Sequence, residues 1–242
     1  MKPRIFPLAL ALLLAAALAP ASRAADVEKT RAGDLTITPI HHASLMFRFE
    51  DKVIHIDPWS QGDYSSQPRA DYIFITDIHG DHMDPAMIDK LRKDSTVVVG
   101  PAAVAEKIHG ITVMHNGESK KFGGFEVEAV PMYNLKRGPQ PGAFYHTKGR
   151  GNGYVFNFGG KRVYVSGDTE AIPEMRELKN ISIAFICMNL PYTMTPEEAA
   201  EAVKEFRPKI VYPYHYSKSD VNAFAAALKG QKGIEVRLRD WY

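Results

Sequence analysis

The sequence predicts a single α+β domain in which two β-sheets pack together and helices cover their outer sides. Short apolar or alternating runs, each bounded by turn residues such as Gly, Pro or Asp, recur through both halves of the chain as strands do. Helical segments are expected between and after these strands, and no linker, repeat or low-complexity segment divides the chain. The roughly 218 residues that follow the N-terminal segment are enough for one domain with a sizeable core.

In the first half, strands are expected at residues 35–39, 45–49, 53–56, 72–76, 96–99 and 125–130. A helix should begin at about Pro85, because Asp84 is a good N-cap and proline suits the first helical position. A short helix is expected at residues 102–108. Residues 135–153 are rich in Gly, Pro, Lys and Arg and lack periodicity, so they predict a long loop of the kind that is usually functional or mobile.

In the second half, residues 154–158 and 162–166 flank Gly159-Gly160 and predict a hairpin. Residues 181–188 form a nearly unbroken apolar run, which indicates a buried strand. Thr195 begins a helix with a capping box, because Glu198 follows three residues later. The remaining elements expected are a strand at 210–214, a helix at 221–229 and a last strand at 234–238.

Residues 1–24 have the features of a secretory signal peptide. Lys2 and Arg4 give a positive start, residues 5–18 are mostly apolar, and residues 22–24 place small side chains where a signal peptidase reads them. The apolar run is short for a bilayer span, which needs about 20 residues, so cleavage after Ala24 is favoured over a membrane anchor. We therefore expect a mature domain of residues 25–242 that is exported, either periplasmic or secreted, with no stable membrane anchor.

Charge and cysteine content narrow the classes of partner and cofactor. The formal net charge is +2, and removing Lys2, Arg4 and Arg23 lowers it by three to −1, so no nucleic-acid partner is expected. Cys187 is the only cysteine and lies in the apolar run 181–188, which predicts a buried, inert thiol and excludes an intramolecular disulfide. Any metal must then be held by histidine and carboxylate side chains.

Residues 71–85, DYIFITDIHGDHMDP, place ligand-type side chains at the end of a predicted buried strand. His79, Asp81 and His82 suit zinc or a similar divalent metal, which accepts imidazole nitrogen and carboxylate oxygen. Gly80 is expected to relieve crowding where these side chains converge. The alternative is an ordinary solvated loop, which would not need so many ligand types directly after a buried strand.

The segment TDIHGDH is similar to the HxHxDH motif of the metallo-β-lactamase-fold hydrolases. Two further stretches follow in that family's order, VSGDT at residues 165–169 and YPYH at residues 212–215. IHHASLMF, IDPW, SGDTEAIPEM and PYHY most resemble the branch of ascorbate-phosphate lactonase-like and N-acyl-phosphatidylethanolamine phospholipase-like proteins. The resemblance implies a four-layer αβ/βα sandwich with a metal site at one edge, between the two sheets.

The resemblance also implies roles for particular residues. Asp81, His82 and His215 match the ligands of the second zinc position, and Asp168 matches the carboxylate that bridges two metals. His79 matches a ligand of the first position. Asp57 matches a carboxylate that orients the histidines bound to the metal.

The sequence departs from the family pattern at two places. Asp77 stands where the first motif histidine is usual, and a carboxylate can still bind zinc there. Residues 132–134, Met-Tyr-Asn, stand where a third histidine for the first metal is expected. Two residues could replace it: Asn134 as a weaker oxygen ligand, or His146 from the long loop. We therefore expect one or two Zn²⁺ ions, with Mn²⁺ or Fe²⁺ as other options for the first position.

Other polar residues carry weaker signals. Residues 146–154, HTKGRGNGY, resemble a pattern that borders the site in some relatives, where Lys148 or Arg150 would neutralise a substrate anion; an ordinary glycine-rich turn is an equal alternative. His42 either contacts substrate or a ligand or is a satisfied buried histidine. A packing or structural role is favoured for His55, His109, His115 and Trp59.

The function predicted is an exported hydrolase that uses a metal-bound hydroxide on a small ester, lactone or phosphodiester. Asp81 or Asp168 would orient the nucleophile or pass its proton to the leaving group. The alternatives are a β-lactam hydrolase and a catalytically inactive protein of the same fold that binds a metal or ligand. The partner expected is a small-molecule substrate, and the sequence predicts no oligomeric state.

Overall fold

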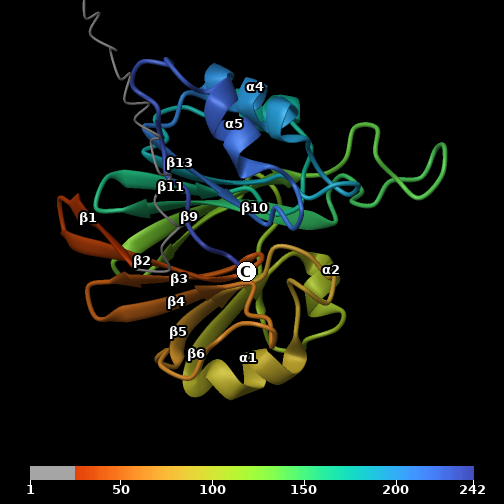
Figure 1. Ribbon diagram of the computed structural model, residues 1–242. Coiled ribbons are helices and arrows are strands. Elements are labelled where there is room, and N and C mark those ends of the chain that lie inside the picture. The colour runs from red at the N-terminus through yellow and green to blue at the C-terminus, as the bar shows by residue number, and fades with distance from the viewer. Residues whose placement is uncertain (1–24) are drawn as a thin grey trace, which may run out of the picture.

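The computed structural model describes residues 25–242, and the expected signal segment, residues 1–24, lies outside them. Two seven-stranded sheets pack against each other (Figure 1). Across the first sheet the strands are β1 (Asp26–Thr30), β2 (Gly33–His41), β3 (Ser44–Phe49), β4 (Lys52–Ile56), β5 (Ala70–Phe74), β6 (Arg92–Gly100) and β7 (Thr112–Val113). Strands β1 to β4 pair antiparallel, and β4 to β7 pair parallel.

The second sheet repeats this pattern. Its strands are β8 (Ser119–Phe122), β9 (Phe125–Met132), β10 (Gly151–Phe158), β11 (Lys161–Val165), β12 (Ile183–Cys187), β13 (Ile210–Tyr214) and β14 (Glu235–Val236). Strands β8 to β11 pair antiparallel, and β11 to β14 pair parallel. Each sheet therefore has an antiparallel half followed by a parallel half, and the carboxyl ends of adjacent parallel strands meet at one edge.

Helices cover the outer side of each sheet. Helices α1 (Pro85–Leu91) and α2 (Ala102–Ala105) lie against the first sheet, whereas α4 (Pro196–Phe206) and α5 (Val221–Ala227) lie over the second (Figure 1). The short helix α3 (Pro173–Arg176) packs beside α4 and β9. Two sheets between two helical layers form the predicted four-layer sandwich, so the fold class is confirmed.

The main core lies between the sheets and is rich in phenylalanine. Phe47 of β3 and Phe74 of β5 contact Phe156 of β10, with ring centroids 5.5 and 4.9 Å apart. All three side chains are fully buried. Each such ring contributes about 1.5–3 kcal/mol through burial of its apolar surface, so these contacts join the two sheets strongly.

Most predicted elements are present, and the helix caps are as expected. The Asp84 carboxylate accepts a hydrogen bond from the Met87 amide, and Thr195 and Glu198 form both hydrogen bonds of the capping box. The sequence prediction missed β1, β7, β8 and α3, all of which are short and three of which lie at or next to a sheet edge. Cys187 is fully buried, as predicted.

Among residues 25–242, no helix has both the length and the apolar character required to cross a bilayer.

Candidate metal centre

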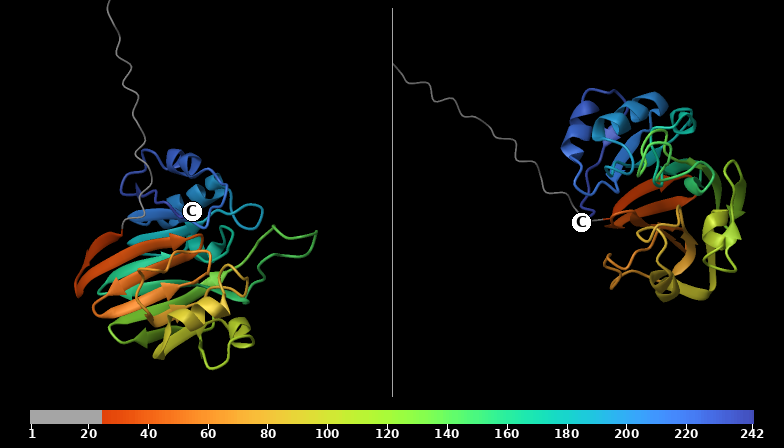
Figure 2. Two further views of the ribbon diagram at one scale, coloured as in Figure 1. Left: turned by 60° about the horizontal axis from the view of Figure 1, so that its bottom comes forward. Right: turned by 90° about the vertical axis from the view of Figure 1, so that its right-hand side faces the viewer.

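The ligand-type residues converge where strands of both sheets end. Asp57 follows β4 and the DIHGDH segment follows β5, while Asp168 follows β11 and His215 follows β13. These parallel strands deliver their carboxyl ends to the same edge, which is where open α/β sheets bind ligands. Two further histidines join them: His42 follows β2, and His146 comes from the loop of residues 133–150 that projects beyond the sheets (Figure 1 and Figure 2).

His82, Asp168 and His215 form the buried centre of the cluster. Asp168 Oδ2 lies 3.3 Å from His82 Nε2, and Asp168 Oδ1 lies 3.2 Å from His215 Nδ1. All three side chains are at most 5% exposed. Each offers a ligand atom within 4.8 Å of the others, a separation that suits one metal ion.

Asp81 lies between His215 and His42 at the edge of this centre. Its Oδ2 is 3.2 Å from His215 Nε2 and 3.1 Å from His42 Nε2. The Asp81 side chain is 28% exposed, so it faces the opening of the site. His42 Nδ1 lies 2.7 Å from the Tyr242 hydroxyl, which fixes the orientation of this ring.

Asp57 orients His82, as the resemblance implied. Its Oδ2 lies 2.8 Å from His82 Nδ1, so the ring donates to the carboxylate and directs Nε2 toward Asp168. The Thr76 backbone N–H and hydroxyl donate to the same carboxylate at 2.7 and 2.5 Å. A buried carboxylate held in this way fixes the tautomer of a histidine ligand.

Asp77 makes an ion pair with a residue from the long loop. Arg150 donates from Nε to Asp77 Oδ1 at 3.0 Å and from a terminal nitrogen to Oδ2 at 2.8 Å. Asp77 Oδ2 also lies 2.8 Å from His79 Nδ1. Both oxygens of this buried carboxylate therefore already have hydrogen-bond donors.

His146 points from the long loop into the cluster. Its Nε2 lies 3.2 Å from Asp168 Oδ2 and 3.9 Å from Asp77 Oδ2. Asn134 lies behind the ring, with its Oδ1 2.8 Å from His146 Nδ1. Asp77, His79 and His146 thus form a second group of three possible ligands beside the first.

The backbone is held in unusual conformations at the site. His42, Asp57 and His215 adopt φ values of 55°, 44° and 47°, in the left-handed region that residues other than glycine seldom occupy. Gly167, just before Asp168, has φ of 60°, and an added Cβ there would lie 2.7 Å from Met132 Sδ. The same Cβ would lie 3.1 Å from Thr76 Cβ, just after β5, so glycine here lets the end of β11 approach the first sheet.

The charges within the cluster shift the pKa values of its members. Burial raises the pKa of Asp168, but the nearby histidines His215 and His82 outweigh it and hold that pKa well below its usual value. Burial also raises the pKa of Asp81, and His82 and His215 again lower it overall. For His82, burial lowers the pKa, whereas the charges of Asp168, Asp81 and Asp57 raise it well above the ordinary value. The centre is therefore built around ionised carboxylates.

The residues present fit a divalent metal. His82 Nε2, His146 Nε2, His215 Nδ1 and Asp168 Oδ1 are buried polar atoms without a well-formed hydrogen bond, although each of the three nitrogens lies 3.2–3.3 Å from an Asp168 oxygen. Such orphaned atoms are costly in a folded protein unless something binds them. Of the four carboxylates at the site, those of Asp57, Asp77, Asp81 and Asp168, only that of Asp77 pairs with a guanidinium, so a cation would also balance the local charge.

Two residues singled out from the sequence have other roles. Lys148 lies away from the cluster: its ammonium is 2.7 Å from Glu174, and its side chain is 62% exposed. The explanation offered for Gly80 was wrong, because an added Cβ would meet nothing within 4 Å. Within residues 146–154, close contacts occur at Gly151 and Gly153 of β10, where an added Cβ would lie 2.6 Å from Met132 Cε and 2.9 Å from the Ser166 carbonyl oxygen, respectively. The segment therefore combines both roles, because Gly149 has φ of 85° in the turn before β10 whereas Gly151 and Gly153 allow close strand packing.

The remaining histidines and Trp59 lie outside the cluster. His55 is buried and lies 3.0 Å from the Pro68 carbonyl oxygen, while His109 and His115 are exposed. Trp59 stacks on His41, with ring centroids 5.6 Å apart. Sequence reasoning missed Tyr242 as the partner of His42, since nothing near either residue indicates a contact across 200 positions.

A hollow of about 330 Å³ opens onto the cluster. It is lined by His79, Asp81, His146 and Asp168, together with Tyr145, Asn189 and Tyr192 from the two neighbouring loops. Its volume is that of a pocket for a small molecule.

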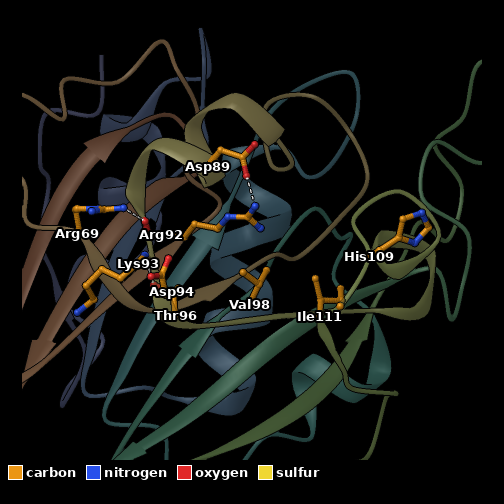
Figure 3. A pocket seen from close by; sticks show the side chains of 10 residues that line it. Arg69, Asp89, Arg92, Lys93, Asp94, Thr96, Val98, His109 and Ile111 are labelled. Atoms are coloured by element: carbon orange, nitrogen blue, oxygen red, sulfur yellow. Dashed lines mark hydrogen bonds and ion pairs between the residues drawn. The ribbon is translucent and has the colours of Figure 1, made fainter.

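A larger hollow, of about 490 Å³, lies on the outer side of the first sheet beside α1 and β6 (Figure 3). Three of its charged side chains are already engaged: Arg92 pairs with Asp89 at 3.0 Å, and Arg69 donates to the Arg92 carbonyl (Figure 3). This larger hollow lies away from the metal cluster. The smaller hollow, which opens onto the cluster, is therefore the candidate active site.

Comparison with known proteins identifies the family. The model of a family described as "Beta-lactamase superfamily domain" matches residues 36–215, which include the cluster from Asp57 to His215. The chain belongs to the β-lactamase superfamily. This confirms the superfamily seen in the motifs, whereas the branch within it stays a prediction.

Several relatives match this protein over most of its length. A UPF0173 metal-dependent hydrolase from Thermus thermophilus is 32% identical over 212 residues, covering 81% of this chain and 91% of the relative. A solved structure from Parabacteroides distasonis, named only as a metal-dependent hydrolase, is 43% identical with a TM-score of 0.85, covering 90% of this chain and 99% of that one. Igni18, a metallo hydrolase from Ignicoccus hospitalis, is 24% identical with a TM-score of 0.71 over 85% of this chain and 95% of its own, and supports the fold alone. The chain is thus placed among the metal-dependent hydrolases of the superfamily.

Proposed function

We propose that this protein hydrolyses a small ester, lactone or phosphodiester with a water activated by zinc. The observation that carries the proposal is the set of buried ligand atoms of His82, His215 and Asp168, which lies beside a 330 Å³ hollow that Asp168 itself lines. Histidine nitrogen and carboxylate oxygen are the donors that zinc prefers when no thiolate is available. His82, His215 and Asp168 would hold the ion, and zinc bound to them would supply an acidified water, with its pKa lowered from 15.7 to about 7, and would polarise the oxygen of the scissile group.

Asp81 is the carboxylate placed to act on the reacting groups. It lines the hollow and is partly exposed, whereas Asp168 is almost fully buried. Its lowered pKa keeps it ionised, so it serves as a hydrogen-bond acceptor that orients a water. His42 and His215 both contact its Oδ2 and so hold it in one orientation.

The walls of the hollow favour a compact substrate. Tyr145 and Tyr192 meet edge to face, with ring centroids 5.0 Å apart, and they border the hollow on the side of the long loop. Aromatic rings at this position would pack on the apolar part of a substrate, while Asn189 offers a polar contact. These features support a small molecule with both polar and apolar parts.

The test is a screen of model lactones, phosphodiesters, esters and β-lactams on the zinc-loaded protein. We expect turnover of at least one of the first three classes, its loss on chelation, and its loss in Asp168→Ala. Preferential turnover of β-lactams would instead support the drug-hydrolysing alternative. Recovery of every compound unchanged from a metal-loaded protein would overturn the hydrolase and favour a binding role.

We also propose that the protein is exported. The support is the positive, apolar and small-residue pattern of residues 1–24, which lie outside the described residues. Mass spectrometry of the protein from fractionated cells should find a periplasmic or secreted chain that begins at Ala25. A full-length chain confined to the cytoplasmic fraction would contradict this.

A further inference from the structure

His146 is the loop residue whose environment most resembles that of a metal ligand. It is 1% exposed, and its Nε2 is buried without a hydrogen-bond partner. That nitrogen faces Asp168 Oδ2 at 3.2 Å, and the ring lies edge-on to His79, with centroids 5.1 Å apart. An imidazole nitrogen enclosed beside a carboxylate and a second imidazole has the surroundings of a metal site.

Asn134 fixes which nitrogen of His146 is available. Asn134 Oδ1 accepts from the His146 backbone N–H at 2.7 Å and lies 2.8 Å from His146 Nδ1. The Asn134 amide nitrogen donates to the Tyr192 carbonyl at 2.8 Å, so the side chain cannot be reversed without losing these contacts. Because Oδ1 can only accept, Nδ1 carries the proton and Nε2 presents its lone pair to the cluster.

The same arrangement recurs at two other histidines of the site. The Nδ1 atoms of His82 and His79 each lie 2.8 Å from a carboxylate oxygen, of Asp57 and Asp77 respectively. In metal sites an oxygen acceptor on one ring nitrogen usually orients the other toward the metal. On this pattern Asp77, whose oxygens both accept from Arg150, is a positioning residue for His79.

Glu170 holds the start of the loop that carries these residues. This buried carboxylate accepts from the backbone N–H groups of three successive residues at 2.9 to 3.1 Å, namely Leu135, Lys136 and Arg137. The Asn134 amide lies 3.4 Å from the same carboxylate. The segment that presents Asn134 is therefore anchored only two residues from Asp168, although the loop itself projects from the sheets.

We infer that His146 is a ligand of the first metal position, in place of the histidine missing after β9, and that Asn134 positions it. The ligands of this position are then His79, His146 and the bridging Asp168, while Asp77 holds His79. This inference rests on the proposed function, because it assumes that His82, Asp168 and His215 bind a metal.

The test is the zinc content per chain after loading and gel filtration, measured by elemental analysis. We expect two equivalents in the unmodified protein, one in His146→Ala and two in His109→Ala, which removes an exposed histidine outside the site. If His146→Ala fails to fold, His146→Gln replaces it, because glutamine fills a similar space without an imidazole. This variant should also bind one equivalent of zinc. Cobalt loading adds a readout independent of turnover, because loss of one ligand alters the visible absorption of the bound ion.

Asn134 is tested by the same binding measurement. Asn134→Ala should weaken binding of the second equivalent by roughly 10- to 100-fold, the usual effect of removing an outer partner of a ligand. Asn134→Asp keeps an oxygen beside Nδ1 and should restore most of the affinity. If Asn134 had only a structural role, Asn134→Ala and Asn134→Asp of equal thermal stability would bind the second equivalent of zinc equally well.

The outcomes separate this inference from the function on which it rests. Two equivalents in both His146 variants would overturn the inference, as would loss of one equivalent in Asp77→Asn with none lost in His146→Ala. The unmodified protein could instead bind one equivalent of zinc, which is lost in His82→Ala and retained in His146→Ala. That result would leave the proposed function intact and remove the inference. No bound metal in the unmodified protein would remove both.

Discussion

At the residue scale, the candidate site depends on acceptors that hold its histidines. Asp57 is the clearest example, since one buried carboxylate accepts from Thr76 and from His82 Nδ1. We expect Asp57→Asn to lower zinc affinity by roughly 10- to 100-fold, because the amide nitrogen would face Nδ1 and no longer accept its proton. Competition with a chromogenic chelator measures this effect. Asp51→Asn, at an exposed turn, is the matched control, and equal affinities of the two variants would contradict the role given to Asp57.

His55 should make stability depend on pH. Burial lowers its pKa to about 4 in the folded protein, from an ordinary value of 6.5. Since the folded pKa is the lower one, only the unfolded chain takes up a proton between these values. The free energy of unfolding should therefore fall as pH drops from 6.5 to 4, by up to about 3 kcal/mol. Above pH 6.5 this residue has no such effect.

The comparison variant is His55→Gln, which does not titrate but can still donate to the Pro68 carbonyl. Urea unfolding of the metal-free proteins at several pH values between 7 and 4.5 should show a steeper decline for the unmodified protein. Parallel declines in the two proteins would mean that His55 is protonated in the folded state.

The sequence motifs predict which residues gather at the site better than they predict the partners of those residues. The HGDH segment could be placed because it follows a predicted strand, and Asp168 and His215 because VSGDT and YPYH resemble motifs of the family. Arg150 and Asp77 are 73 positions apart, and their ion pair exists only because β10 lies beside the end of β5. Spacing along the chain contains no information on such a contact, so the sequence alone could not predict that Arg150 pairs with Asp77.

At the element scale, helix α4 is the one whose start is best defined by local chemistry. The Glu198 amide donates to Thr195 Oγ1 at 3.1 Å, and the Glu198 carboxylate accepts from the Thr195 amide at 2.9 Å. We expect Thr195→Ala to lower the free energy of unfolding by about 1 kcal/mol, since the amide loses its acceptor. Urea denaturation measures the loss. Thr195→Ser retains the hydroxyl and should be close to neutral, whereas equal losses in both variants would point to packing instead of capping.

Elements stabilised by local signals were predictable, and those stabilised by their neighbours were not. The α4 capping box and the hairpin at Gly159-Gly160 each depend on residues that lie within a few positions of one another in the sequence. Strand β1 alternates weakly and contains charged residues; it forms because β2 pairs with it and because Asp26 accepts from Arg239 at the far end of the chain. Strand β7 has only two residues and exists by pairing with β6.

At the scale of the whole molecule, the site is where the two sheets are joined by polar groups. Asp57, Asp81 and His82 come from the first sheet, and Asp168 and His215 come from the second. The phenylalanine core holds the sheets together elsewhere, but at this edge buried carboxylates and unpartnered ring nitrogens face one another. Buried polar groups that lack partners are destabilising, so this edge is the part of the interface that most needs a bound cation.

Metal removal should therefore lower the stability of the entire domain. A ligand that binds only the folded state at 100 times its dissociation constant adds about 2.7 kcal/mol, which for a domain of this size raises the melting temperature by roughly 5–10 °C. We expect a chelator to lower the melting temperature of the zinc-loaded protein by about this amount, with one cooperative transition in both states because the two sheets share one core. Asp168→Ala lacks the carboxylate that lies 3.2–3.3 Å from ring nitrogens of His82, His146 and His215, so its melting temperature should be the same with and without chelator. A chelator effect of equal size in Asp168→Ala would show that the stabilising ion binds elsewhere, and no effect in the unmodified protein would show that the two sheets do not depend on a metal at this edge.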